Sequence, residues 1–320
     1  LLSKKRKDGD LMRIVFMGTP DFALVSLKAL CDAGHEVAAV FTQTDKPKGR
    51  GNRLCASPVK EYALKEGITV YQPASLKRET AEYAGIISSL QPDVIVVVAY
   101  GKLLPPEILS IPRLGCVNVH GSLLPSYRGA APIQWTVING DEYGGITTML
   151  MSEKMDAGDI LLQQPVKLDF SETASEYYQR LSHVGAELLV KTLSGLEKNE
   201  IAPIKQDESG VSLAPVLTRS MSRISFDMPA ERVFHMIMGL SDWPCAECVI
   251  DGKKLKIYRC ELVDRDSCHA PGTVLDSQDF TVACGRGSVR LTEVQAEGGK
   301  RMPDKAYHLG HPIKKGTVLE

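Results

Sequence analysis

Short apolar runs alternate with segments of helical spacing along the first two-thirds of the chain. Alternation of this kind is typical of a mostly parallel sheet with helices on both faces. The run at residues 93–99 is almost wholly apolar, as expected of a strand buried on both faces. The predicted strands cover residues 13–17, 36–42, 68–71, 93–99, 115–120 and 145–151, and the predicted helices cover 21–31, 75–90, 131–139 and 173–196.

The pattern changes in the last third of the chain. Residues 199–223 are polar and irregular, a helix is predicted at 230–239, and short strands follow at 255–262, 272–275, 280–284 and 288–294. The dipeptide Asp251-Gly252 is a hairpin signal. We therefore predict an α/β fold with a Rossmann-like, mostly parallel sheet in the N-terminal domain and a small C-terminal β-barrel of OB-like type. The expected division is a disordered extension at 1–11, a catalytic domain at 12–205, a linker at 206–222 and the C-terminal domain at 223–320.

Composition narrows the class of protein. A chain of 320 residues, 43% hydrophobic and 24% charged, is long enough for two ordinary globular domains. The formal net charge of −1 gives no global basic field, so any polyanion must bind a local patch. No apolar run approaches the roughly 20 residues that span a bilayer.

The cysteines indicate the compartment. Eight of them are scattered without the spacing of a disulfide framework, which predicts a reduced, cytoplasmic protein. Cys245 and Cys248 have zinc-knuckle spacing, but no second pair of ligands accompanies them, so no metal is expected.

The strand at 115–120 carries the first candidate chemistry. Asn118 and His120 are two apart, so their side chains should project from the same face. Acyl transfer needs a hydrogen-bond donor for the developing oxyanion and a group that moves a proton near neutral pH. A structural histidine at a strand end is the alternative, and the spacing alone leaves both open.

An acid follows the next predicted strand. Asp156 comes after residues 145–151, so in a parallel sheet it would lie at the same edge as His120. Ligands of such sheets bind at that edge, and an acid there would orient the imidazole or pass a proton through water. A plain turn before Gly158 is the alternative.

Residues 42–60 form a basic segment. They include Lys46, Lys48, Arg50 and Arg53 against the single acid Asp45, and prolines and glycines interrupt them, so no regular helix or strand is expected. The segment is either a solvated surface loop or an arm that binds the phosphates of a nucleic acid.

The chain lacks the sequence signatures of several other enzyme classes. The first strand-turn, Met17-Gly18-Thr19-Pro20-Asp21-Phe22, has one glycine, and its proline removes an amide that would face a phosphate, which disfavours a dinucleotide-binding oxidoreductase. The chain has no Walker A run, no G-x-S-x-G elbow and no H-E-x-x-H pair.

Four segments together resemble the methionyl-tRNA formyltransferases, a branch of the 10-formyltetrahydrofolate-dependent formyltransferases. They are residues 17–23, residues 42–60, Ala99-Tyr100-Gly101, and the run from Asn118 to Pro132. Relatives of the last run, Asn-x-His followed by Ser-Leu-Leu-Pro and Arg-Gly, also occur in glycinamide ribonucleotide and sugar-nucleotide formyltransferases. That run therefore indicates the chemistry better than the acceptor.

The resemblance implies an enzyme that transfers the formyl group of 10-formyltetrahydrofolate to initiator methionyl-tRNA for translation initiation, acting as a cytoplasmic monomer. It implies these site residues: catalytic Asn118, His120 and Asp156; folate-binding Ser122, Leu123, Leu124, Pro125, Tyr100 and Gly101; and tRNA-binding Lys46, Lys48, Arg50 and Arg53.

Three alternatives stay open. The hydrolase domain of 10-formyltetrahydrofolate dehydrogenase has a similar architecture, a formyltransferase with a small acceptor would share the chemistry, and a non-catalytic RNA-binding module would share the scaffold. The chain also departs from the family in its last third. The run Ile224-Ser225-Phe226-Asp227 occurs where the family often has Trp after an acidic or amide residue, and Met238 replaces a frequent Arg.

Overall fold

The computed structural model describes residues 11–48, 53–264, 268–276 and 278–320. Residues 1–10 of the predicted extension, and Arg50, lie outside the described residues. The described chain divides into two compact units, neither continuous in sequence. The first comprises residues up to 129, 145–166 and 179–213, and the second comprises 130–144, 167–178 and 214–320.

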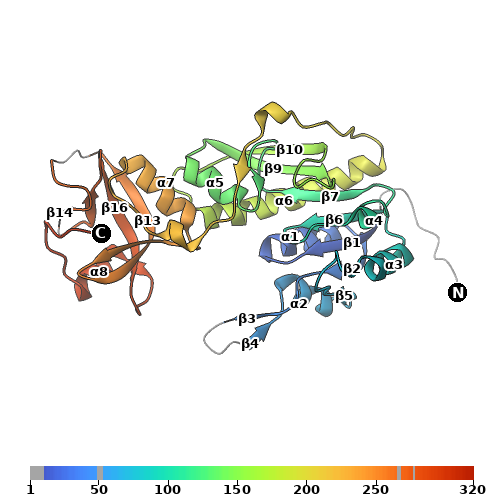
Figure 1. The fold of residues 1–320 in the computed structure, drawn as a ribbon, viewed down its shortest axis with the longest axis horizontal. Coiled ribbons are helices and arrows are strands. Elements are labelled where there is room, and N and C mark those ends of the chain that lie inside the picture. Colours follow the sequence, from blue (N-terminus) through green and yellow to red (C-terminus); the bar gives the residue numbers. More distant parts are fainter. Residues whose placement is uncertain (1–10, 49–52, 265–267, 277) are drawn as a thin grey trace. The chain divides into compact units, whose positions relative to one another are not determined.

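The first unit is built on a mostly parallel sheet, as predicted (Figure 1). Over the described residues its order is β10 (Ile160–Lys167), β9 (Tyr143–Leu150), β7 (Cys116–His120), β6 (Val94–Val98), β1 (Arg13–Gly18), β2 (Glu36–Phe41) and β5 (Val70–Tyr71). Its helices are α1 (Asp21–Asp32), α2 (Pro58–Lys65), α3 (Thr80–Leu90), α4 (Pro106–Leu109) and most of α6 (Ala174–Glu197).

The two faces of this sheet are distinguished by alternate residues of each strand. On one face a buried cluster includes Met17, Val97 and Cys116, together with Ile87 of α3 and Ile108 of α4. On the other face α6 passes so close to β7 that a Cβ at Gly185 would lie 3.1 Å from Val119 Cγ1. Because side chains alternate along a strand, Asn118 and His120 belong to the face of Cys116, opposite α6.

One expectation about this sheet is wrong: β9 runs antiparallel to β7, with Val117 opposite Leu150 and His120 opposite Thr147. The sequence also gave no signal for β10, whose exposed residues interrupt any strict alternation. The helix between β7 and β9, α5 (Pro132–Asn139), belongs to the second unit, so it does not form the crossover over this sheet that a parallel β9 would need.

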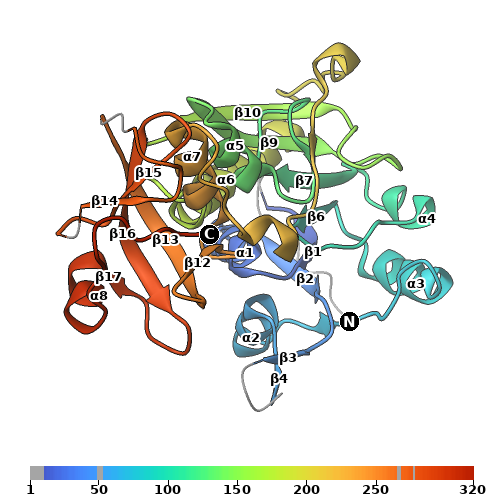
Figure 2. The ribbon, with the colours of Figure 1, turned by 60° about the vertical axis from the view of Figure 1, so that its left-hand side comes forward.

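The basic segment also differs from expectation, because it contains a short hairpin (Figure 2). β3 (Lys46–Lys48) pairs antiparallel with β4 (Arg53–Cys55). Pro47 is tolerated because it lies in a two-stranded ribbon, where a strand has an open edge and a missing N–H leaves no ladder bond unmade.

The second unit is a separate antiparallel sheet with helices. Its strand order is β12 (Ala246–Ile250), β13 (Lys253–Val263), β16 (Ser288–Ala296), β15 (Thr281–Ala283) and β14 (Val274–Asp276), with β17 (Met302–Pro303) also on β16. Its helices are α5 (Pro132–Asn139), α7 (Ala230–Leu240) and α8 (Asp304–Gly310), with the first turn of α6. Short elements complete the chain: β8 (Arg128–Gly129), η1 (Glu208–Gly210), β11 (Leu213–Ala214) and η2 (Arg219–Ser222).

Two early segments belong to this second unit. Helix α5 packs so closely on α7 that a Cβ at Gly239 would lie 2.4 Å from Ile138 Cγ1. The first turn of α6 carries a capping box, in which Thr173 Oγ1 accepts from Glu176 N and Glu176 Oε2 accepts from Thr173 N. Burial alone would raise the pKa of Glu176, but hydrogen bonds from Thr173 and Arg259 outweigh it and lower the pKa.

Candidate active site

Asn118 and His120 are presented by a strand held on both sides. Parallel pairing sets Val97 beside Asn118, and antiparallel pairing sets Met149 there on the other side. Asn118 is half-buried, and the described residues give its amide no hydrogen bond. The Asn118 amide can therefore form hydrogen bonds with a ligand.

His120 is almost fully buried, with 6% of its surface exposed. Its Nε2 lies 2.9 Å from the carbonyl oxygen of Tyr127. Since a carbonyl only accepts, Nε2 carries the hydrogen and donates. In the neutral imidazole, Nδ1 is therefore the basic nitrogen.

Asp156 faces that nitrogen. Its Oδ1 lies 3.8 Å from His120 Nδ1, longer than a hydrogen bond and suited to a bridging water. Its Oδ2 accepts from Gly129 N at 2.8 Å. The expected proximity to His120 is therefore confirmed in position, but the reason given for it was wrong. β9 is antiparallel, so Asp156 reaches His120 because residues 151–159 fold back along the sheet.

Two residues behind Asp156 were missed from the sequence. Arg128 is buried, and Gln206 lies in the segment predicted to be a linker. Arg128 was visible within the run from Asn118 to Pro132, but nothing in the run indicated its partner. No local pattern connects Gln206 to a residue fifty positions earlier.

The predicted folate-contacting loop is tightly braced. Ser122 Oγ donates to Ser126 O at 2.6 Å, and Thr147 Oγ1 donates to Ser122 O at 2.6 Å. Leu124 N donates to Thr147 Oγ1 at 3.0 Å. Ser122 and Leu124 are buried, whereas Leu123 and Pro125 are half-exposed. The loop therefore offers a ligand mainly its backbone and the latter two side chains.

Tyr100 and Gly101 lie just beyond β6, at the edge where β1 and β2 also end. The carbonyl of Tyr100 accepts from Gln43 Nε2 at 3.0 Å and from Thr19 Oγ1 at 3.4 Å. The Tyr100 ring is buried in the core cluster, and burial raises the pKa of its hydroxyl. Gly101 has φ +75°, and a Cβ there would lie 2.5 Å from Gln43 Nε2.

Of the predicted tRNA-binding residues, Lys46 is exposed on β3, while Lys48 and Arg53 pair across the hairpin at the backbone. Arg50 is outside the described residues. The base of the hairpin is fixed by Lys60 Nζ, which donates to Asp45 Oδ2 at 2.7 Å and to Gln72 Oε1 at 2.8 Å.

The zinc-knuckle spacing has no structural counterpart among the described residues. Cys245 and Cys248 are buried, and burial raises the pKa of the Cys248 thiol to about 12. Within the described ranges, no group of three or more His, Cys, Asp or Glu could hold a metal ion. Nor is any described helix long and apolar enough to cross a membrane.

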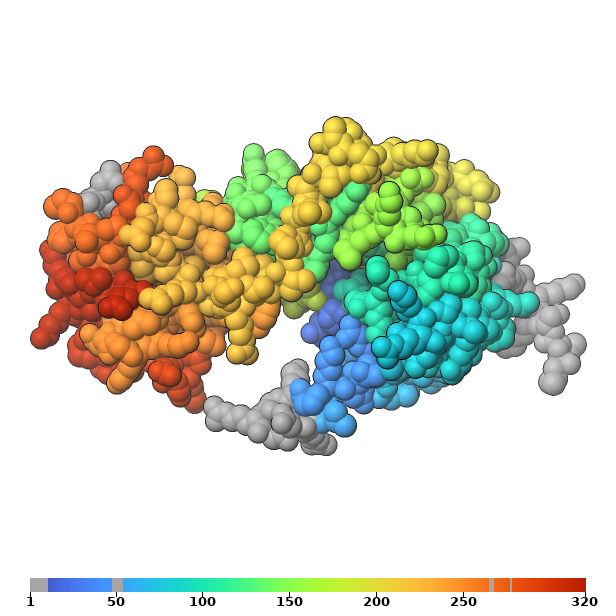
Figure 3. All heavy atoms as spheres, in the orientation of Figure 1, coloured from blue at the N-terminus to red at the C-terminus, as the bar shows by residue number. Residues whose placement is uncertain are grey.

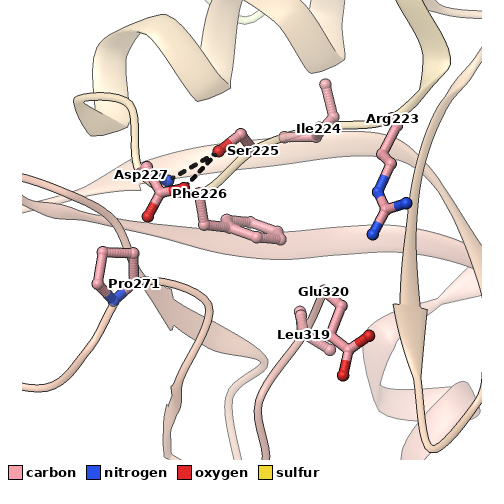
Figure 4. Close-up of a pocket in the computed structure, with 8 residues that line it drawn as sticks. All are labelled: Arg223, Ile224, Ser225, Phe226, Asp227, Pro271, Leu319 and Glu320. Carbon is pink, nitrogen blue, oxygen red and sulfur yellow. Dashed lines mark hydrogen bonds between the residues drawn. The ribbon is translucent and has the colours of Figure 1, made fainter. Parts of the chain in front are cut away.

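A pocket of about 350 Å³ lies in the second unit (Figure 4). It is lined by the segment that departs from the family, including Phe226, and by the end of the chain at Leu319 and Glu320. Ser225 Oγ donates to Asp227 Oδ2 at 2.9 Å, so these two groups satisfy each other. The pocket contains none of the predicted site residues.

Comparison with known proteins places these features in a family. Residues 12–193 match the family Formyl transferase, and residues 217–312 match Formyl transferase, C-terminal domain. A methionyl-tRNA formyltransferase of Caldanaerobacter subterraneus subsp. tengcongensis is 46% identical over 310 residues, covering 97% of this chain and 100% of the relative. That of Lachnospira eligens is 49% identical over 315 residues, covering 96% and 99%.

Solved structures share the fold at lower identity. An N-formyltransferase from Helicobacter canadensis, in complex with folinic acid and dTDP-3-aminofucose, has a TM-score of 0.68 at 16% identity and covers 88% of this chain and 99% of its own. HypX from Aquifex aeolicus, in complex with tetrahydrofolic acid, has a TM-score of 0.64 at 18% identity, and this chain spans 50% of it. The family matches and the nearly full-length identities together assign this chain to the formyl transferase family.

Proposed function

We propose that this chain transfers the formyl group of 10-formyltetrahydrofolate to the α-amino group of methionyl-tRNA. The observation that carries the proposal is the gathering of His120 and Asp156 beside Asn118, in a chain whose nearly full-length relatives bear the name methionyl-tRNA formyltransferase. The initiator tRNA is the acceptor that this reaction would use in translation initiation.

In the first step the methionyl nitrogen attacks the formyl carbon on N10 of the folate. A C–N bond forms and the carbonyl oxygen becomes an oxyanion. The Asn118 amide donates to that oxygen, and protonated His120 stabilises its charge. The described residues form no hydrogen bond with the Asn118 amide, so none has to break before the amide binds the oxyanion.

In the second step the bond from the formyl carbon to N10 breaks, and a proton moves from the attacking amine to N10. His120 exchanges the proton at Nδ1, because Nε2 donates to Tyr127 O. Protonated Nδ1 gives its proton to N10 as the bond breaks and then accepts one from the attacking amine. Asp156 supports the relay through one bound water, which the 3.8 Å separation from Nδ1 accommodates.

The donor and acceptor use different parts of the chain. We assign the folate to the loop Ser122–Leu123–Leu124–Pro125 and to the edge at Tyr100 and Gly101. Lys46, Lys48 and Arg53 of the hairpin would bind phosphates of the tRNA acceptor arm, together with Arg50, which lies outside the described residues.

The C-terminal sheet is proposed to close as an OB-like barrel that also contacts RNA. Its terminal segment supports closure, because Glu320 exchanges hydrogen bonds with Val249 of β12 while Leu319 N donates to Gly272 O beside β14. We further propose that the protein acts as a monomer in the cytoplasm. Sedimentation at assay concentration tests the monomer.

The decisive experiment measures formyl transfer from 10-formyltetrahydrofolate to methionyl-tRNA, with glycinamide ribonucleotide and water as competing acceptors. We expect methionyl-tRNA to dominate. Removing one oxyanion donor usually costs about 10²–10³ in rate, so Asn118→Ala and His120→Ala should each lose that much.

Other outcomes point to the alternatives. Release of formate with no tRNA product would indicate a hydrolase, and formylation of the ribonucleotide would indicate a small acceptor. Tight tRNA binding with no transfer at all would indicate a non-catalytic RNA-binding module. Wild-type turnover by both variants would overturn the catalytic assignment.

A further inference from the structure

The loop that carries Asp156 is held by one side-chain amide from far along the chain. Gln206 Nε2 donates to the carbonyl oxygen of Asp156 at 2.8 Å and to that of Gly158 at 2.7 Å. In the space-filling view the segment after α6, in yellow, lies against this yellow-green loop (Figure 3). Both amide hydrogens of Gln206 therefore form hydrogen bonds with the loop.

The orientation of that amide is fixed by a buried guanidinium. Gln206 Oε1 accepts from Arg128 Nε at 3.0 Å and from Nη2 at 2.8 Å. Because Arg only donates, the amide oxygen must face Arg128 and the amide nitrogen must face the loop. Arg128 is 9% exposed, and Glu208 balances its charge with Oε1 at 2.9 Å from Nη2.

The loop needs such support because its backbone is constrained. Asp156 has φ +51°, a conformation that residues other than glycine adopt at a cost. Gly129, which follows Arg128, holds the carboxylate of Asp156 directly, because its N–H donates to Asp156 Oδ2. Arg128 thus supports the backbone of Asp156 through Gln206, while its neighbour orients the carboxylate.

We propose that Gln206 is a positioning residue for catalysis, which sets the separation between Asp156 and His120 through the backbone of residues 156–158, with Arg128 fixing Gln206. This inference rests on the proposed function, because it assigns a purpose to Asp156. Gln206 touches neither substrate in this account. Its loss should therefore lower kcat and leave the KM values for tRNA and folate within about twofold.

Gln206→Glu separates positioning from structural support. The new carboxylate keeps one oxygen as the acceptor for Arg128 and adds an ion pair. Its second oxygen replaces the amide nitrogen, so it has no N–H for the two carbonyls and repels them. We expect Tm to hold or rise while kcat falls by about tenfold or more, since an ångström of misplacement can cost about 10²-fold. Gln206→Leu, which removes both sets of bonds, should lower kcat and Tm together.

The matched control is Gln91→Glu. Gln91 is exposed at the C-cap of α3 and precedes β6, so it lies at the sheet edge away from His120. It receives the same change in charge and should keep wild-type kcat. Asp156→Asn is measured in parallel.

Two results overturn the inference: a wild-type kcat in Gln206→Glu, or a loss of kcat in that variant that merely follows a loss of Tm. A wild-type kcat in Asp156→Asn would instead refute the role of Asp156 in the proposed function. The two failures are therefore distinguishable.

Discussion

Gly158 is the residue at which the active-site loop has least freedom. A Cβ there would lie 1.7 Å from the carbonyl oxygen of Leu150, so the backbone must move to admit any side chain. We predict that Gly158→Ala loses about 1–3 kcal/mol of unfolding free energy and about tenfold or more in kcat, because Asp156 moves with the loop. Denaturant unfolding and steady-state kinetics measure both.

Gly85→Ala is its control. Gly85 is exposed in α3 with nothing within 4 Å of an added Cβ, so alanine should stabilise the protein by about 0.5–1 kcal/mol and leave kcat unchanged. Equal effects of the two substitutions would contradict the steric argument.

Tyr100 offers a test of how the folate edge is used. Its hydroxyl is buried without a partner among the described residues, while its carbonyl is the group that Gln43 and Thr19 contact. We predict that Tyr100→Phe keeps the KM for 10-formyltetrahydrofolate within twofold and does not lower Tm, because no hydrogen bond is lost. A several-fold rise in that KM would show that the ring hydroxyl meets the donor.

Single residues were predictable where chemistry follows local spacing. Asn118 and His120 share a face because they are two apart on a strand, and the sequence alone specifies that. The pairing of Gln206 with Asp156 depends on where a polar segment crosses the surface after α6, and no local pattern encodes it.

At the scale of elements, a hydrogen-bonded cluster of Asp45, Lys60 and Gln72 holds the base of the β3–β4 hairpin in place. Lys60 binds both Asp45 and Gln72, and Gln72 Nε2 also donates to Gln43 O at 2.7 Å. We predict that Lys60→Met raises the KM for methionyl-tRNA roughly threefold to tenfold, because a free hairpin must be ordered upon binding. The KM for folate should not change, and parallel rises in both would contradict a local role.

The pH response of the same cluster has a defined sign. Hydrogen bonds from Lys60 and then Gln72 lower the pKa of Asp45 from its ordinary value of 3.8. A lowered carboxyl pKa contributes stability above 3.8 and loses it as pH falls through the lowered pKa. Between pH 5 and 8 the titration of Asp45 should therefore not change the KM for tRNA. Asp45→Asn at pH 7 should give the same change in that KM as protonation of Asp45 gives at low pH.

Most elements were predictable from periodicity. Helix α2, which begins inside the basic segment expected to be irregular, was missed, and so were β10 and the β3–β4 hairpin. The strands of the parallel core and the helices α1, α5, α6 and α7 lie close to the predicted ranges, because each has a full period of apolar positions. β10 is eight residues long but exposed at four of them, and the two hairpin strands have three residues each. Their stability comes from a neighbouring strand and not from their own pattern.

At the scale of the whole molecule, the boundaries of the two units determine which fragments can fold, and they do not coincide with the predicted linker at 206–222. The second unit takes residues 130–144 and 167–178 from the middle of the chain. A fragment ending at residue 213 would keep α5 but lose α7, so Ile138, which lies against Gly239 of α7, would lose its cover. Burying such a side chain contributes about 1.5–3 kcal/mol. We predict that this fragment aggregates or binds a hydrophobic dye, whereas a native-like Tm and no dye binding would favour a simple linker division.

The discontinuous second unit also sets an order on synthesis at the ribosome. Helix α5 emerges early, and its partner α7 follows roughly ninety residues later, which takes about 5–20 s at ordinary rates of translation. Throughout that interval the nascent chain carries α5 without the helix that packs against it. We therefore expect slower translation between residues 140 and 230 to prolong the exposure of α5 and to lower the yield of folded protein, which expression with synonymous codons of different speed would measure.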